Sequence, residues 1–140
     1  MSGWFLDASV LLASEALEDE NHRSARRLLT GSDALATLDL AFYEVTNVAI
    51  RAWRDPLAAG RLCERVSALA DDGGLVRADS ELIAEAVALA AEQGISVYDA
   101  AYVVGARISA SELVSCDLRD LVKRGLARLP KDAEAARSTS

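Results

Sequence analysis

Trp4-Phe5-Leu6-Asp7-Ala8-Ser9 is the stretch of sequence that decides the fold. Three apolar residues end in an aspartate, and small residues and an apolar, helix-compatible run follow. A short continuous apolar run is typical of a strand buried on both faces of a parallel sheet. The sequence therefore predicts a strand that turns into a helix at Asp7. Ligands of open α/β sheets bind outside the carboxyl ends of the strands, so Asp7 is either a site residue or an ordinary helix N-cap.

The same alternation of strands and helices continues along the chain. Short apolar runs at 34–38, 75–78 and 112–116 predict further strands, and 126–130 predicts an edge strand that ends in proline. Helical patterns separate these runs, which favours a parallel sheet with right-handed crossovers. We therefore predict an α/β fold with three layers: a short, mostly parallel sheet of four to five strands between two layers of helices.

Length and composition are those of one ordinary globular domain. The chain has 140 residues, of which 51% are hydrophobic and 26% charged. We predict a single domain over residues 1–130 and a disordered tail over 131–140, where large apolar residues are almost absent. Cys63 and Cys116 lie too far apart to suggest a metal-binding pair. We expect a cytoplasmic protein with no signal peptide and no membrane span.

The charge balance restricts how the protein can bind nucleic acid. With 15 basic and 22 acidic residues, the formal net charge is −7. This argues against a broad basic surface, which is what supplies nonspecific affinity for phosphates. It leaves open an acidic pocket that holds a divalent metal ion, since a bound cation lets a phosphate approach.

Three aspartates stand where the predicted elements place side chains at the carboxyl edge of the sheet. Asp7 and Asp117 each follow a predicted strand. Asp99 opens a helix, and with Ser96 it fits the S-x-x-D capping box, which is a complete structural explanation of its own. The same position also presents its carboxylate at a helix N-terminus facing the crevice, and both roles can hold together.

Glu44 is the fourth acid of interest, because it lies in an apolar part of a predicted long helix. A buried charge without a partner is very costly, and Asn47 lies three residues further on, on the same helical face. The alternative is that Glu44 simply reaches solvent past its neighbours.

Four converging carboxylates would repel one another unless they share protons or cations. Mg²⁺ and Mn²⁺ are the hard cations that carboxylate oxygens bind, with water and substrate phosphate completing the coordination. Such a site hydrolyses phosphodiester bonds by activating water and screening charge in the transition state. The residues therefore favour a metal-dependent phosphodiesterase.

The sequence resembles the PIN-domain ribonucleases, and specifically the VapC-type toxins of bacterial toxin–antitoxin pairs. The resemblance spans Trp4 to about Pro130, and its four pieces occur in order: Leu6-Asp7-Ala8-Ser9, Tyr43-Glu44-Val45-Thr46-Asn47, Tyr98-Asp99-Ala100-Ala101-Tyr102-Val103 and Ser115-Cys116-Asp117. Members of this family cleave RNA with Mg²⁺ or Mn²⁺ held by four acids. The matching positions here are Asp7, Glu44, Asp99 and Asp117.

The resemblance also implies supporting residues and partners. Ser115 stands where the family often has a hydroxyl near the metal, and Asp120, one helical turn beyond Asp117, is a further candidate whose simpler interpretation is a surface residue. The implied partners are an antitoxin that covers the acidic groove, the RNA substrate and a second copy in a homodimer.

Two alternatives stay open from the sequence. The first is a catalytically silent PIN-like binding module. The second is a receiver-like phosphoacceptor domain, which the sequence fits poorly because Ala8 and Ser9 follow Asp7 and Lys123 lies inside a predicted helix.

Overall fold

The computed structural model describes residues 3–138 and contains a parallel sheet of four strands. Its order is β3-β2-β1-β4, with the first strand of the chain near the centre. Leu6 at the end of β1 pairs with Thr37 of β2 on one side and with Val114 of β4 on the other. The strands are β1 (Trp4–Leu6), β2 (Leu35–Leu38), β3 (Leu75–Val76) and β4 (Glu112–Val114). The predicted parallel α/β sheet is confirmed, with four strands.

The predicted edge strand at 126–130 is reduced to a single bridge. Arg128 pairs with Val114 in parallel, and its N–H donates to the Leu113 carbonyl at 2.9 Å. The pairing ends there because Pro130, which has no N–H to donate, starts a helix directly after Leu129.

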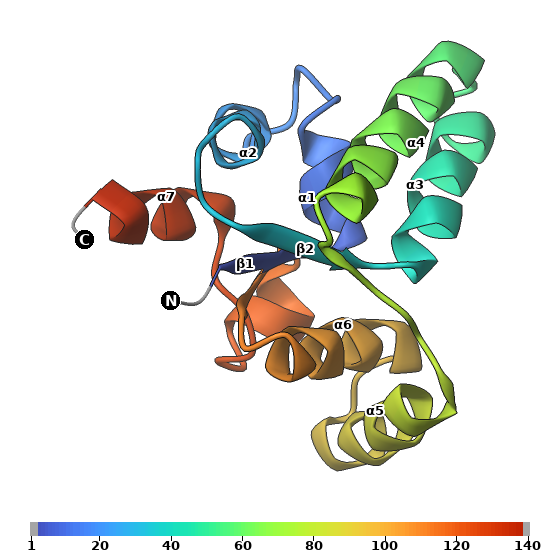
Figure 1. Cartoon of the computed structure of the whole chain (residues 1–140), viewed down its shortest axis with the longest axis vertical. Coiled ribbons are helices and arrows are strands. Elements are labelled where there is room, and N and C mark those ends of the chain that lie inside the picture. The colour runs from blue at the N-terminus through green and yellow to red at the C-terminus, as the bar shows by residue number, and fades with distance from the viewer. Residues whose placement is uncertain (1–2, 139–140) are drawn as a thin grey trace.

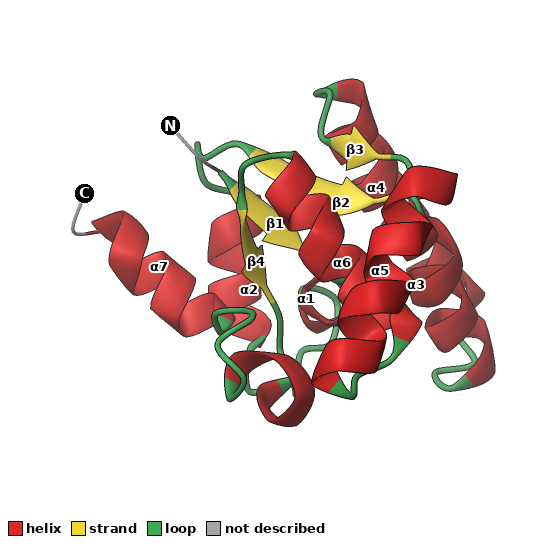
Figure 2. Cartoon of the chain, turned by 90° about the horizontal axis from the view of Figure 1, so that it is seen from below, coloured by secondary structure: helices red, strands yellow, loops and turns green. Residues whose placement is uncertain are grey.

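Helices cover both faces of the sheet, as predicted (Figures 1 and 2). On one side lie α1 (Ala8–Ala13), α2 (His22–Leu29), α3 (Leu40–Arg51) and α4 (Pro56–Asp71); on the other lie α5 (Ser80–Gln93) and α6 (Val97–Ile108). Small residues let α6 approach the strands closely. A Cβ added to Gly105 would lie 2.8 Å from the Phe5 ring, so only glycine fits there without a shift. Close packing fixes where α6, and hence Asp99, sits against the sheet.

The prediction of a disordered tail from residue 131 is wrong for most of that segment. Residues Pro130–Ser138 form α7, which packs on α2 (Figure 1). Ala133 is fully buried, and Arg27 of α2 donates to Glu134 at 2.7 Å. The segment lacks large apolar residues, but alanine is the best helix former and proline is well accepted in a first helical turn. A neighbouring helix supplies the surface that an isolated segment would lack. Residues 139–140 lie outside the described residues.

Among the described helices, none is long and apolar enough to cross a membrane.

Candidate active site

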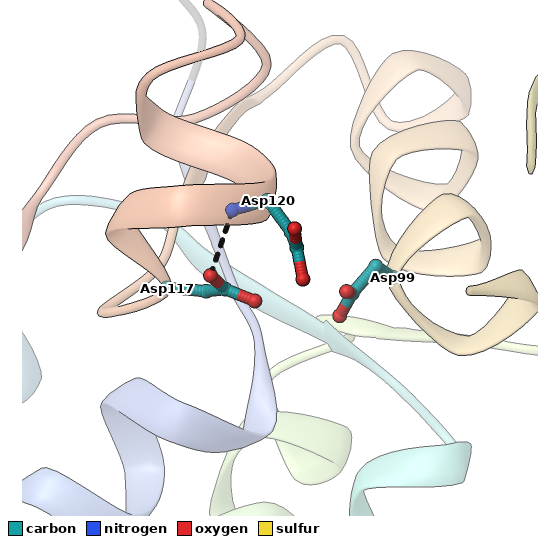
Figure 3. Close-up of side chains that lie close together, drawn as sticks. All are labelled: Asp99, Asp117 and Asp120. Carbon is teal, nitrogen blue, oxygen red and sulfur yellow. Dashed lines mark hydrogen bonds between the residues drawn. The ribbon is translucent and has the colours of Figure 1, made fainter. Parts of the chain in front are cut away.

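Three aspartates meet at the carboxyl edge of the sheet (Figure 3). Asp99 lies in the first turn of α6, Asp117 follows β4, and Asp120 lies in η1 (Leu118–Val122), a short π-helical turn. Each offers a carboxylate oxygen, and these three oxygens all lie within 4.8 Å of one another. All three residues are partly exposed, so solvent and ligands reach them.

Local hydrogen bonds set the positions of these aspartates. The Asp117 carboxylate caps η1 by accepting from the Asp120 N–H at 2.9 Å, which fixes the two residues relative to each other. The Ser96 hydroxyl accepts from the Asp99 N–H at 3.0 Å, the helix cap that the sequence predicts. The cap uses the backbone of Asp99, so its carboxylate faces Asp117 and Asp120 (Figure 3). Asp99 is therefore both part of a cap and part of the acidic cluster.

Asp7 is buried next to this cluster, with 5% of its surface exposed. Its carboxylate accepts from the Ser9 hydroxyl and from the Val10 N–H, so it also caps α1. Burial raises the pKa of Asp7 from 3.8 to about 6, although hydrogen bonds from Ser115, Ser9 and Val10 oppose the rise. Half of the Asp7 population therefore carries a proton at about pH 6 when no cation is bound.

Glu44 lies on α3 and has one hydrogen-bond partner on α6. The Tyr102 hydroxyl donates to Glu44 Oε1 at 2.7 Å. Burial raises the pKa of Glu44, the Tyr102 hydrogen bond lowers it, and the charge of Asp99 raises it again. Tyr102 is itself 2% exposed, and burial together with the nearby Glu44 charge raises its pKa, so it remains a donor. The glutamate that the sequence places among apolar neighbours thus has the partner that its burial requires.

Asp99 is the acid whose charge affects all the others at the site, which are Asp7, Glu44, Asp117 and Asp120. Burial raises its pKa, and the charges of Asp117 and Asp120 raise it further. The charge of Asp99 in turn raises the pKa values of Asp7 and Glu44. Negative charges coupled in this way favour the binding of a cation. The donor set consists of carboxylate oxygens, which fits a hard divalent cation such as Mg²⁺ or Mn²⁺.

Only some of the residues predicted from the sequence belong to the closest group of carboxylates. Asp99 and Asp117 belong to the closest group, with Asp120 as the third member, whereas Asp7 and Glu44 couple to the group through Asp99. Ser115 is fully buried, and its hydroxyl accepts from the Asp117 N–H at 3.0 Å. Asn47 is exposed on α3 and is not in the group of aspartates.

Two residues whose roles the sequence does not predict also belong to the site. Tyr102 holds Glu44, and Ser9 links two strand ends: it donates to Asp7 and accepts from the Cys116 N–H at 2.9 Å. The position of Tyr102 could have been predicted from the sequence spacing, because Tyr102 lies three residues after Asp99 and therefore on the same face of the helix.

Tyr102→Phe is expected to weaken Mn²⁺ binding by about 10- to 100-fold, the range seen when a residue that orients a metal ligand is lost. The ring still packs edge-on against Phe5, at a centroid distance of 6.4 Å, so only the hydrogen bond to Glu44 is removed. Isothermal titration with Mn²⁺ measures the effect. Tyr43→Phe, which removes an exposed hydroxyl, is the matched control. Equal Mn²⁺ affinity in Tyr102→Phe and wild type would contradict a positioning role.

Comparison with known proteins identifies the family. The PIN domain family matches residues 4–125. "Ribonuclease VapC3" of Pyrobaculum aerophilum is 33% identical over 115 residues, which cover 80% of this chain and 87% of that protein.

Two solved structures share the fold. The crystal structure of PAE2754 from Pyrobaculum aerophilum is 26% identical, with a TM-score of 0.70, and the match covers 99% of this chain and 91% of that one. A chain of a toxin–antitoxin complex from Klebsiella pneumoniae has a TM-score of 0.66 at 16% identity, over 90% of this chain and 96% of that one. The fold, the family match and the VapC relative agree, and the chain belongs to the PIN-domain family.

Proposed function

We propose that this PIN domain is a divalent-metal-dependent endoribonuclease that hydrolyses RNA phosphodiester bonds as the toxin of a toxin–antitoxin pair. The observation that carries the proposal is the group of carboxylate oxygens from Asp99, Asp117 and Asp120, all within 4.8 Å of one another. The relative named as a ribonuclease covers 80% of the chain and supports the same activity.

In this proposal Asp99, Asp117 and Asp120 hold Mg²⁺ or Mn²⁺. Asp7 and Glu44 add negative charge around the bound ion. A divalent cation bound there supplies an activated water and stabilises negative charge on the phosphate. The pKa of Asp7 is raised to about 6, so this residue can hold a proton or accept one near that pH, and burial raises the pKa of Glu44 as well. Ser115 fixes the loop that carries Asp117 through the hydrogen bond to its N–H.

Cysteine chemistry does not compete with this assignment at the same sheet edge. Burial raises the pKa of the Cys116 thiol to about 12, so the thiolate that a nucleophilic mechanism needs is rare at neutral pH. The hydroxyl of Ser9 beside it is already engaged with Asp7 and the Cys116 N–H.

We further propose an antitoxin partner, a homodimer and a cytoplasmic place of action. An antitoxin partner is supported by the toxin–antitoxin complex among the structural neighbours. A homodimer is proposed from the resemblance to VapC-type toxins. A cytoplasmic setting is consistent with Cys63 and Cys116, which are both unpaired.

Thermal stability measured against Mn²⁺ concentration tests the metal site directly. An ion that binds only the folded chain raises its stability by RT ln(1 + [L]/Kd), about 2.7 kcal/mol at a hundredfold excess over Kd. Wild type should show a saturable rise that EDTA reverses. Asp71→Asn, which removes an exposed acid at the end of α4, should behave like wild type. Wild type that shows no rise would overturn the metal site.

A further inference from the structure

A pocket lies at the opposite end of β4 from the acidic cluster. It has a volume of about 380 Å³, is open to solvent and is formed by the end of α6, the start of β4 and the segment 125–128. Ser111 and Glu112 at the start of β4 line it, whereas Asp117 follows the end of the strand. Ser111 and Asp117 are six residues apart, so at most about 20 Å separates them. We call this cavity the arginine pocket.

Two arginines give the arginine pocket a positive charge. Arg107 on α6 lines it and makes no ion pair within residues 3–138. Arg128 forms an ion pair with Glu112, in which Nε lies 3.1 Å from Oε2 and Nη2 donates to Oε1 at 3.4 Å. Both N–H groups on Nη1 of Arg128 therefore remain for a ligand. The three side chains give the pocket a net charge of +1, in a chain whose net charge is −7.

The apolar lining of the pocket strengthens the effect of this charge. Val103, Ala106 and Leu113 line the pocket and are only 3–4% exposed. A cavity with low-dielectric walls focuses the electric field of its charges and attracts ions of the opposite sign. The planar guanidinium of arginine binds phosphate oxygens through paired N–H groups. The arginine pocket is therefore suited to a phosphate group.

Basic residues continue from the arginine pocket to the acids. The segment 119–131 contains five of the 15 basic residues of the chain and only one of its 22 acids, Asp120. Five residues lead from Asp120 to Gly125, which lines the pocket, and the exposed side chains between them belong to Lys123 and Arg124. An anionic polymer that reaches the acids therefore meets a positive segment beside them.

We propose that the arginine pocket binds a backbone phosphate of the RNA strand away from the bond that is cut, with Arg107 and Arg128 as the donors. The inference rests on the proposed function, because that function makes RNA the ligand. The pocket differs from the metal site in both place and chemistry, since guanidinium groups at the start of β4 bind the strand and carboxylates beyond its end hold the cation. A phosphate carries no base identity, so the pocket adds affinity and orients the strand without selecting a base.

Anisotropy of a fluorescein-labelled RNA of about 12 nucleotides, measured in EDTA at several salt concentrations so that no cleavage occurs, tests the pocket. Arg107→Gln should weaken binding by about 3- to 10-fold, because water and salt screen an exposed charge contact. The slope of the logarithm of the association constant against that of the salt concentration should become less steep by about 0.7, the value for one phosphate contact with a single strand. Arg107→Lys keeps the charge and should keep the slope. Arg77→Gln removes an exposed arginine beside β3, at the other edge of the sheet, and is the matched control.

Glu112→Gln should have the opposite effect. It removes the negative charge from the pocket and releases Arg128, so RNA should bind about 2- to 5-fold more tightly. A purely structural role of these side chains would not weaken binding in one variant and strengthen it in the other. Unchanged affinity and slope in Arg107→Gln would overturn the proposal, and so would weaker binding by Glu112→Gln.

Two other anions test whether RNA is the ligand. If AMP raised the thermal stability of wild type but not of Arg107→Gln, while both proteins bound RNA alike, the ligand would be a free nucleotide and the proposal would fail. If an oligoglutamate peptide displaced the labelled RNA at lower concentrations than unlabelled RNA of the same charge does, the pocket would be a surface for an acidic protein. The proposal would fail in that case too.

Mn²⁺ titrations of the same proteins separate this inference from the proposed function. Arg107→Gln should keep the full stabilisation by Mn²⁺, because the carboxylates of Asp99, Asp117 and Asp120 are unchanged. RNA binding that depends on Arg107 in a wild type that Mn²⁺ does not stabilise would contradict the metal site and support the pocket. RNA binding that does not depend on Arg107 in a wild type that Mn²⁺ stabilises would overturn the pocket and leave the proposed function standing.

Discussion

Asp99→Asn is expected to abolish detectable RNA cleavage and the stabilisation by Mn²⁺ while the fold remains intact. The charge of Asp99 interacts with the charges of all four other acids of the site. Its loss therefore reduces the negative potential of the whole site and not only one contact to the cation. Removal of one group that stabilises transition-state charge typically lowers kcat by about 100- to 1000-fold. A lost metal ligand should cause at least that decrease. Cleavage rates and Mn²⁺ titrations measure both effects.

The fold should survive because the cap of α6 uses atoms that asparagine keeps. The Ser96 hydroxyl accepts from the backbone N–H of residue 99, whichever side chain follows. Circular dichroism and thermal unfolding in EDTA should therefore match wild type. Glu92→Gln removes a charge from the exposed surface of the neighbouring α5 and is the control. An Asp99→Asn protein that unfolds would indicate that the carboxylate is structural, and one that still cleaves RNA would exclude the acidic cluster as the active site.

The sequence predicts the part of the site that depends on topology. Parallel strands end at a shared edge of the sheet, so recognising the strands is enough to place Asp7 after β1 and Asp117 after β4 at the same edge, and in the structure β1 and β4 are paired. Asp99 follows from its cap, because Ser96 fixes where α6 begins. These inferences need only local patterns and the pairing of neighbouring strands.

Contacts between distant segments are the part that the sequence does not predict. The sequence predicts Asp120 to be a surface residue on an ordinary helical turn. In the structure η1 is a π-helical turn, in which the Lys123 N–H donates to the Leu118 carbonyl at 2.8 Å. Asp120 on this turn lies close to Asp99. The hydrogen bond from Tyr102 to Glu44 joins residues 58 apart in the sequence. Composition alone predicts a disordered tail over 131–140, whereas the helix α7 (Pro130–Ser138) depends on the surface of α2, on which it packs.

Asp7→Asn is expected to raise the free energy of unfolding of the metal-free protein at pH 7, by as much as about 3 kcal/mol. Burial raises the pKa of the folded Asp7 carboxyl from 3.8 to about 6. Well below pH 3.8, the pKa of the unfolded carboxyl, the group is protonated in both states and has no effect. Between about pH 4 and 6 the unfolded chain releases the proton and the folded chain keeps it, so stability falls as the pH rises. Above pH 6 the loss is complete and constant.

Asparagine removes this loss because it carries no charge to desolvate. Its carbonyl oxygen can still accept from the Ser9 hydroxyl and the Val10 N–H, so the cap of α1 is kept. Urea unfolding in EDTA at several pH values should show a gain in the free energy of unfolding for Asp7→Asn that is small at about pH 4 and nearly full at about pH 7. Asp71→Asn, at an exposed position, should change stability little. A variant less stable than wild type at pH 7 would show that the charged form is favoured by its hydrogen bonds.

The stabilities of wild type and Asp7→Asn in EDTA and in Mn²⁺ together show whether Asp7 belongs to the metal site. In EDTA the buried carboxylate of Asp7 destabilises the fold, so a purely structural N-cap would be better served by asparagine. In saturating Mn²⁺ the charge of Asp7 favours the bound cation, and wild type should gain more stability than Asp7→Asn. The difference in stability between the two proteins should therefore shrink or change sign when Mn²⁺ replaces EDTA. A difference that stays the same in both conditions would assign Asp7 to the cap of α1 alone, because a residue outside the metal site cannot respond to the metal.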